Sequence, residues 1–153
     1  VWESEPEINE GLLKAVDIGT PHIAGYSLDG KTNGTVLVYE AICDFLKIPC
    51  RWKLPGLPLP EFSKIEICTD DKSDEEILAE VIEKAYDIER DDRSLRRILK
   101  TAHEDKRPFF DGLRKNYPLR REFDAVEVTL KGKNLRIKQK LKKLGFQIKD
   151  FPL

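Results

Sequence analysis

Histidine, methionine and cysteine are all scarce in this sequence of 153 residues, which has two histidines, no methionine and three cysteines. The cysteines form no C-x-x-C pair, and with only two histidines this argues against a zinc site. An odd number of unpaired cysteines is typical of reduced thiols in a cytoplasmic protein. Because the chain begins at Val1 and contains no methionine, we expect it to be a portion of a longer protein.

Long apolar runs and export signals are also missing. No stretch approaches the roughly 20 residues that a membrane-spanning helix needs, and the N-terminal region has neither a basic leader nor a cleavage site. With 40% hydrophobic and 36% charged residues, a chain of this length can still bury a core, which excludes wholesale disorder. We therefore expect a folded, cytoplasmic protein that does not associate with membranes.

The charges are unevenly distributed, although the formal net charge is only −1. Residues 63–92 carry 12 acidic and 4 basic side chains, whereas residues 93–153 carry 18 basic and 7 acidic ones. These two blocks can pair within one chain or across a symmetric dimer. The basic block could also meet a polyanion, but no aromatic residues stand between the lysines of residues 131–143, as single-stranded nucleic acid would favour. We expect no nucleic-acid partner.

The first third of the chain is predicted to be mostly helical. Asn9 is a plausible N-cap for a short helix over residues 9–16, and apolar residues at three- and four-residue spacing predict a helix from about 29 to 47. Residues 49–62 then contain four prolines and a glycine. Because proline cannot donate a backbone hydrogen bond and restricts the residue before it, this stretch is predicted to be a stiff, extended linker.

The remaining residues predict a small sheet with helices. Ile65 and Ile67 alternate with polar residues as in a strand, the run from Ser73 to Glu76 is a capping-box sequence, and Gly145 is placed to end a helix. The predicted elements are a strand at 64–68, a helix at 73–86, a short helix after the DIERDD run of 87–92, a helix at 108–117, a strand at 125–130, a helix at 134–144 and a strand at 146–151.

This β-α-α-α-β-α-β order predicts an α/β (α+β) fold with a three-stranded sheet. Helices on one face would leave the other face in need of cover, which a second subunit could supply. We expect a homodimer through residues 63–153, with part of a large aromatic set at its interface. That set is Phe109, Phe110, Tyr117, Phe123, Phe146 and Phe151.

The two histidines differ in their surroundings. His103 lies in a polar loop, and we expect it to be solvated. His22 stands between Pro21 and Gly25 in a short, rigid segment that suits a strand end or a loop at a site. From the residues alone it is either a catalytic or a structural histidine. Three upstream carboxylates could pair with its ring: Glu3, Glu5 and Glu7.

Several runs of this sequence resemble a known family. VWESEPEIN at the start and TPHIAGYSLDGK at 20–31 resemble the end of the catalytic portion of the NAD-dependent D-2-hydroxyacid dehydrogenases. Other runs are similar to the C-terminal domain of the branch that acts on erythronate 4-phosphate, and the longer ones are specific to it. They are PEF at 60–62, YDIERDDRSLR at 86–96, FDGLRKNYPLRREF at 110–123 and KLGF at 143–146.

The resemblance implies roles for four residues. His22 matches the family's catalytic histidine, the proton donor in the reducing direction, and Glu5 matches the carboxylate that supports it. Gly25 matches a position that touches the NAD cofactor, and Tyr26 matches a substrate-contacting position of the erythronate-phosphate branch. Ser4 stands where the family has glycine, a departure that should leave the chemistry unaffected.

The resemblance also implies a reaction. An enzyme of this branch is a homodimer that uses NAD to oxidise 4-phospho-D-erythronate, a small phosphorylated sugar acid, to 2-oxo-3-hydroxy-4-phosphobutanoate on the route to pyridoxal 5′-phosphate. The hydroxyl proton would pass to the histidine while hydride leaves the same carbon. The carboxylate would stabilise the imidazolium that forms.

Two parts that such an enzyme needs are missing. The sequence has no G-x-G-x-x-G loop to hold a pyrophosphate, and no position matches the arginine that binds the substrate carboxylate. We therefore expect a C-terminal portion that is inactive alone. The resemblance divides it into the tail of a Rossmann-type NAD-binding domain (1–30), a connecting helix (31–48), the proline-rich linker (49–62) and a dimerisation domain (63–153).

Two questions stay open at the level of sequence. The chain could instead be a non-catalytic α/β interaction or regulatory module. The basic clusters could form ion pairs within the domain or across a dimer, or one of them could reach the substrate phosphate in a neighbouring subunit. These clusters are Arg96-Arg97, Arg114-Lys115 and Arg120-Arg121, and the acidic candidates are Asp87, Asp91, Asp92 and Glu122.

Overall fold

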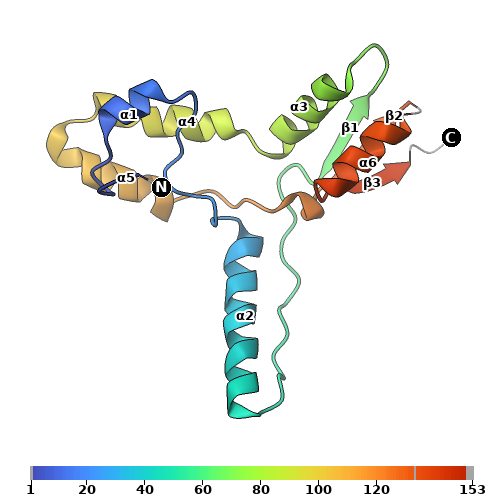
Figure 1. Cartoon of the computed structure of the whole chain (residues 1–153), viewed down its shortest axis with the longest axis horizontal. Helices are drawn as coiled ribbons and strands as arrows, with labels where there is room; N and C mark the ends of the chain where they lie inside the picture. The colour runs from blue at the N-terminus through green and yellow to red at the C-terminus, as the bar shows by residue number, and fades with distance from the viewer. Residues whose placement is uncertain (1, 133, 151–153) are drawn as a thin grey trace. The chain divides into compact units, whose positions relative to one another are not determined.

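The computed structural model describes residues 2–132 and 134–150, which form two compact units. The first combines residues 2–24 with 86–118, and the second combines 25–85 with 119–150. The helices and strands (Figure 1) are α1 (Glu10–Ala15), α2 (Leu28–Leu46), β1 (Lys64–Cys68), α3 (Asp74–Ala85), α4 (Ile88–Arg96), α5 (Lys106–Lys115), β2 (Glu127–Lys131), α6 (Leu135–Lys143) and β3 (Gln147–Asp150). Short 3-10 turns cover Arg97–Lys100, His103–Asp105 and Phe123–Ala125.

The first unit is a group of short helices around a small apolar core. α1 begins after Asn9, whose side chain accepts a hydrogen bond from the amide of Leu12 at 3.0 Å, as the sequence predicted. The core draws on both stretches of chain, so the N-terminal segment folds onto α4 and α5. Its buried members are Ile8, Leu13, Leu95, Ile98 and Phe110.

α4 begins earlier than the sequence analysis expected. Residues 87–92 were predicted to precede a helix, but the helix already starts at Ile88. Asp87 is its N-cap, and its side chain accepts a hydrogen bond from the amide of Arg90 at 2.8 Å. Acidic residues suit a first helical turn because they offset the positive end of the helix dipole. The acidic run therefore starts the helix.

The second unit is built on a parallel sheet in the order β1-β2-β3. Ile65 pairs with Val128, and Val128 pairs with Ile148. The predicted three-stranded α/β fold is thus confirmed. Helices α3 and α6 bury one face of this sheet, and Phe146 stacks on Phe123 at 4.4 Å between ring centres. The main buried residues of this core are Ile65, Ile67, Ile77, Val81, Val128, Leu130, Ile137 and Leu141.

The opposite face of the sheet is charged. β1 alternates strictly between buried and exposed residues, and its exposed Glu66 pairs with Lys131 of β2 at 3.0 Å. On the next pair of strands, Lys149 lies 2.6 Å from Glu127. Water can solvate these side chains in the single chain, and the expectation that a second subunit covers this face stays a prediction.

Most element boundaries follow the predicted pattern. β1 occupies the expected residues, and the capping box forms: Ser73 accepts from the amide of Glu76 at 3.2 Å, and Glu76 accepts from the amide of Ser73 at 2.8 Å. Gly145 follows α6 with a φ of 105°, which favours glycine. The last strand was predicted to reach Phe151, which lies outside the described residues.

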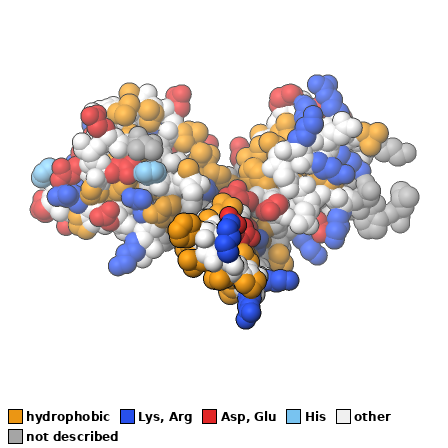
Figure 2. Space-filling model, turned by 60° about the horizontal axis from the view of Figure 1, so that its bottom comes forward, with side chains coloured by type: hydrophobic (Ala, Val, Ile, Leu, Met, Phe, Trp, Pro, Cys, Tyr) orange, Lys and Arg blue, Asp and Glu red, His pale blue; other side chains and the backbone are white. Residues whose placement is uncertain are grey.

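α2 and the linker make up the most exposed apolar part of the described chain. Tyr39 in α2 accepts hydrogen bonds from the amides of Arg51 and Trp52 at 2.9 and 3.1 Å, so the linker runs back along the helix. In Figure 2, where α2 points toward the viewer, hydrophobic side chains gather on it. Phe45 is 83% exposed. Within the described residues, no helix has the length and apolarity to cross a membrane.

Candidate active site

Glu5 and His22 meet in the first unit. Nδ1 of His22 lies 2.8 Å from Oε2 of Glu5, and their side chains are 39% and 16% exposed. A carboxylate bonded at Nδ1 favours the tautomer with its proton on that nitrogen, which leaves Nε2 free to accept a proton. Of the three upstream carboxylates that could have met this ring, Glu5 is the one that does, whereas Glu7 lies 3.4 Å from Arg107.

The segment around His22 is held in a tight backbone conformation. His22 has a φ of 56°, in the left-handed region, and it lies between the buried residues Pro21 and Ile23. The carbonyl of Thr20 accepts from the amide of His22 at 2.9 Å and from the indole nitrogen of Trp2 at 2.7 Å. Trp2 also donates its own amide to Oε1 of Glu5 at 2.9 Å. Trp2 thus connects the side chain of Glu5 to the backbone of the segment that carries His22.

α4 supports the loop that leads to His22. Arg96 donates from its guanidinium to the carbonyls of Leu13 and Val16, both at 2.9 Å. Its Nε bonds both carboxylate oxygens of Asp92, and Asp92 accepts from the amide of Gly19 at 2.7 Å. The contacts join residues separated by 73 to 83 positions. No local sequence pattern indicates such a clamp, so sequence reasoning missed this use of Arg96.

The environment keeps Glu5 ionised. Burial raises the pKa of its carboxyl, but hydrogen bonds from His22 and the amide of Trp2, with the positive charges of His22 and Arg114, lower the pKa below its usual range. An ionised Glu5 can both orient a neutral imidazole and stabilise an imidazolium. The pair therefore has the arrangement of a general base with its supporting carboxylate.

Gly25 and Tyr26, the other two predicted site residues, belong to the second unit. Gly25 is exposed, and a side chain at its position would meet no atom within 4 Å. Tyr26 is half-buried, and the ammonium of Lys31 lies 4.2 Å from the centre of its ring. The backbone at Gly25 is thus open to close approach by a ligand, and Tyr26 stands beside a positive charge.

One arginine of each basic cluster forms an ion pair within the chain. Arg96 pairs with Asp92 as expected. Arg121 instead pairs with Asp29, at 2.9 Å between Nε and Oδ2, with side-chain exposures of 11% and 10%. Asp29 was not among the acidic candidates named from the sequence. His103 is exposed, as predicted.

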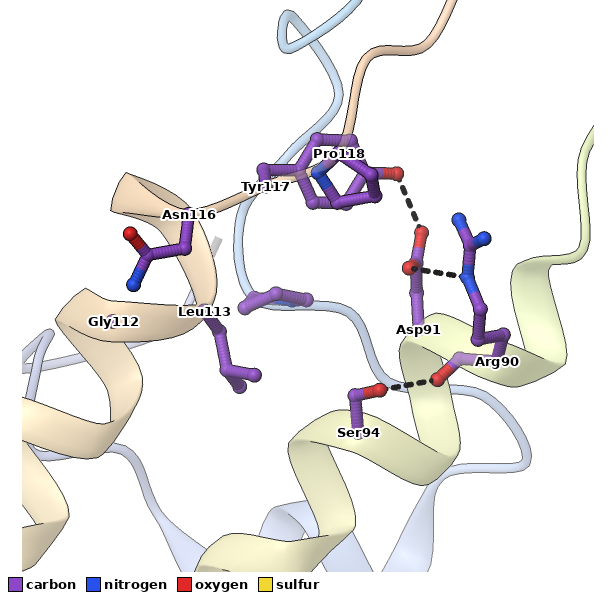
Figure 3. Close-up of a pocket in the computed structure, with 9 residues that line it drawn as sticks. Arg90, Asp91, Ser94, Gly112, Leu113, Asn116, Tyr117 and Pro118 are labelled. Carbon is purple, nitrogen blue, oxygen red and sulfur yellow. Dashed lines mark hydrogen bonds and ion pairs between the residues drawn. The ribbon is translucent and has the colours of Figure 1, made fainter. Parts of the chain in front are cut away.

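A cavity of about 300 Å³ lies between α4 and α5 and shares Pro21 with the loop before His22. Its polar side chains mostly bond one another (Figure 3): Asp91 accepts from Tyr117 at 2.7 Å and lies 3.8 Å from Arg90, and Ser94 donates to the Arg90 carbonyl. Among the described residues, no group of acidic, histidine or cysteine side chains is arranged to hold a metal ion.

Comparison with known families decides where the chain belongs. Residues 57–145 match the family described as a domain of unknown function (DUF3410). The chain belongs to this family. The match covers the linker end, strands β1 and β2 and helices α3 to α6, and it includes Asp92, Arg96 and Arg114.

Curated erythronate-4-phosphate dehydrogenases are similar over nearly the whole chain. The relative from Marinobacter nauticus is 41% identical over 150 residues, which cover 97% of this chain and 39% of that protein. The relative from Cronobacter sakazakii is 42% identical over 154 residues, covering 100% and 38%, and that from Proteus mirabilis is 44% identical over 129 residues, covering 84% and 32%. These matches confirm the resemblance noted in the sequence.

The chain spans about two-fifths of the length of these relatives, and it matches their C-terminal part. The two residues that form the candidate acid/base pair lie before the stretch matched by the family model. The described residues therefore contain the Glu5–His22 pair and, in α4 and α5 of the same unit, part of the domain of unknown function.

Proposed function

We propose that the whole protein is an NAD-dependent dehydrogenase that oxidises 4-phospho-D-erythronate to 2-oxo-3-hydroxy-4-phosphobutanoate. The observation that carries this proposal is the 2.8 Å pairing of His22 with Glu5 in a chain similar throughout to curated erythronate-4-phosphate dehydrogenases. We place the reaction in the cytoplasm, on the route to pyridoxal 5′-phosphate. The described residues contribute the acid/base part of this chemistry.

In the proposed reaction, Nε2 of His22 takes the proton of the substrate's 2-hydroxyl group as the bond from carbon to hydrogen breaks. The imidazole becomes an imidazolium, and Glu5 stabilises the new charge through Nδ1. NAD, when bound, accepts the hydride from the same carbon. In the reverse direction, His22 returns the proton to the carbonyl oxygen of the 2-oxo acid.

Gly25 and Tyr26 are proposed to border the ligands. The open space at Gly25 would allow a cofactor to approach the backbone closely, which a larger residue would hinder. Tyr26 carries a phenolic hydroxyl that can bond a hydroxyl or phosphate oxygen, and the nearby Lys31 is positively charged. Gly25 would thus contact the NAD, and Tyr26 the phosphorylated sugar acid.

The central test compares the two histidines in the whole protein. His22→Gln should lower kcat by about 100- to 10,000-fold or more, the usual size of a general acid–base contribution. Glu5→Gln should also lower kcat and shift the acidic limb of the pH–rate profile. The matched control is His103→Gln, which removes an exposed histidine and should leave kcat unchanged. Near-normal kcat in His22→Gln would overturn the proposed role of His22, whereas a whole protein without dehydrogenase activity would favour a non-catalytic interaction module.

We also propose that the chain forms a homodimer through residues 63–153. The support differs from that expected, because Phe110 and Phe146 are buried in the chain's own cores. Exposed apolar side chains remain on this stretch, among them Leu119 and Leu135, which are 55% and 75% exposed. Apolar side chains of this size are suitable for the core of an interface.

Light scattering on this chain can test the dimer and locate it. The chain should have the mass of a dimer at low salt and about 100 µM protein, a concentration at which even a weak micromolar complex is occupied. Leu135→Glu should weaken association, whereas Phe45→Glu on α2 should not. A persistent monomer would contradict the dimer, and an effect of Phe45→Glu alone would move the interface to α2.

A further inference from the structure

The C-terminal end of α5 lies beside the carboxylate of Glu5. Nη1 of Arg114 is 3.9 Å from Oε2 of Glu5, the oxygen that also bonds His22. The Arg114 side chain is 30% exposed, so the charge interaction is less screened than at an open surface. Glu5 is thus contacted by His22, by the amide of Trp2 and by a guanidinium from the family domain.

α4 and α5 are tied both to each other and to the loop before His22. Asp91 in α4 accepts from the hydroxyl of Tyr117, just beyond α5, at 2.7 Å. One residue further along α4, Asp92 accepts from the amide of Gly19 and pairs with Arg96. Because these contacts connect α5, α4 and the loop in turn, the position of Arg114 relative to Glu5 is set by a continuous network.

The acid/base pair needs an ionised Glu5. Only the carboxylate form can both accept a hydrogen bond from the protonated Nδ1 of a neutral imidazole and stabilise, by its negative charge, the imidazolium that forms when Nε2 takes a proton. A protonated Glu5 could donate to Nδ1 instead, which would favour the tautomer with its proton on Nε2. That nitrogen would then be unable to accept the substrate's proton.

We infer that Arg114 is a positioning residue, which keeps the Glu5 carboxylate ionised and turned toward His22. For its catalytic consequence, this inference rests on the proposed function. It assigns to a domain of unknown function a part in the acid/base site, in addition to the proposed dimerisation. Arg114 acts through Glu5 and does not itself transfer a proton.

The direction of the effect follows from the groups that face Glu5. Among the described residues, the charged or titratable ones are His22, from the loop after α1, and Arg114, from α5. Burial raises the pKa of Glu5 and the charge of Arg114 lowers it, so removing this charge should raise the pKa of Glu5. Lysine at this position keeps a positive charge and should limit the rise.

Carbon-13 NMR titration of the Glu5 carboxyl in this chain tests the inference directly. Arg114→Gln should raise the titration midpoint of Glu5, and Arg114→Lys should leave it closer to that of the unchanged chain. The matched control is Arg107→Gln, on the same helix, where the arginine faces Glu7 at the surface. In a Trp52→Phe background, Trp2 fluorescence reports whether the first unit is still folded. An unchanged Glu5 midpoint in a folded Arg114→Gln chain would overturn the inference.

Kinetics of the whole protein separate this inference from the proposed function. Arg114→Gln should lower kcat by roughly 10- to 100-fold, in line with the loss caused by small displacements at a site, with little change in KM. The acidic limb of its pH–rate profile should move to higher pH. If His22→Gln abolishes kcat but Arg114→Gln leaves the profile in place, the inference fails and the proposed function stands. If the Glu5 midpoint moves but His22→Gln keeps its kcat, the positioning contact stands and the proposed function fails.

Discussion

Ser4 and His22 both adopt a backbone conformation that residues with a side chain rarely take, with φ angles of 62° and 56°. The left-handed region costs roughly 1–2 kcal/mol per residue outside glycine. Ser4 immediately precedes Glu5, and His22 is the other member of the pair. Both strained positions therefore lie at or next to the Glu5–His22 pair, and backbone strain of this kind often occurs at functional sites.

Replacing Ser4 by glycine should stabilise the first unit by up to about 1 kcal/mol. The relief of strain is partly offset because glycine loses more conformational entropy on folding than serine, at a cost of about 0.5–1 kcal/mol. Trp2 and Trp52 lie in different units, so urea unfolding followed by Trp2 fluorescence in a Trp52→Phe background reports the first unit. Ser94→Gly inside α4 is the control and should destabilise by roughly 0.5 kcal/mol. A loss of stability in Ser4→Gly would contradict the strain argument.

At the residue scale, the sequence could predict the candidate pair only through the resemblance. The residues alone left Glu3, Glu5 and Glu7 as equal partners for His22, because their separations from the histidine differ by only a few positions. The choice of Glu5 depends on Trp2, which bonds both Glu5 and Thr20. Such a three-way contact forms only when distant segments are folded together, so no spacing rule predicts it.

Among the elements, α2 is attached to the rest of its unit by a buried ion pair at its first turn. Asp29 bonds the guanidinium of Arg121 and accepts from the amide of Glu122 at 2.8 Å. The amide of Leu28 also donates to the carbonyl of Arg120 at 2.8 Å. These contacts connect the start of α2 to the chain that enters β2, with few other buried residues along the helix.

Asp29→Ala should destabilise the second unit by about 3 kcal/mol, because it leaves the Arg121 charge buried without its partner. Hydrogen exchange at the amides of β1 and β2 measures this loss in the unit concerned. Arg93→Ala removes a surface arginine that pairs with Asp87 and Glu89, and it should change stability by less than about 1 kcal/mol. Equal effects of the two substitutions would contradict the importance of burial at Asp29.

The same pair predicts sensitivity to acid. Burial raises the pKa of Asp29, but hydrogen bonds from Arg121 and the amide of Glu122 and the charge of Arg121 lower it below its ordinary value of 3.8. A lowered pKa adds stability above pH 3.8 that is lost as the pH falls through the folded-state value. The stability of the second unit should therefore fall more steeply with acid below pH 3.8 than that of Asp29→Asn. Parallel curves for the two chains would refute this.

Local patterns predicted elements well where they depend on near neighbours. The alternation of Ile65 and Ile67, the capping box at Ser73 and the glycine at 145 all involve residues within five positions of one another, and each forms as expected. α4 was misplaced because the acidic run of 87–92 reads as a polar loop when the capping role of Asp87 is not recognised. The charged face of the sheet was missed because the pattern of the strands was read for its apolar residues alone.

On the scale of the whole molecule, the division of the described chain into two units cuts across the sequence. The first unit joins residues 2–24 to 86–118, so the stretch between them forms part of another unit. The predicted functional division at residues 30, 48 and 62 stays a prediction, since compactness alone does not test it. Composition and hydrophobic periodicity describe neighbouring residues, so they could not predict that two distant stretches of the chain form one unit.

This chain alone should bind NAD weakly or not at all. Its sequence has no G-x-G-x-x-G loop, and Gly25 is only one predicted point of contact with the cofactor. Calorimetric titration of the chain with NAD should show no binding in the micromolar range, whereas the whole protein should bind under the same conditions. A micromolar dissociation constant for the chain would contradict this expectation.

The discontinuous first unit has a consequence for synthesis on the ribosome. Glu5 and His22 are made first, and the residues that hold them, Asp92, Arg96 and Arg114, are translated about 70 to 110 positions later. At roughly 5–20 residues per second, the nascent N-terminal segment waits about 5 to 20 seconds for its support. A transcript that stops just before the codon for Tyr86 would yield a polypeptide with both members of the pair but without α4 and α5, which contact Glu5 and the loop before His22. During that interval, quality control in the cell would meet this segment without the helices that support it.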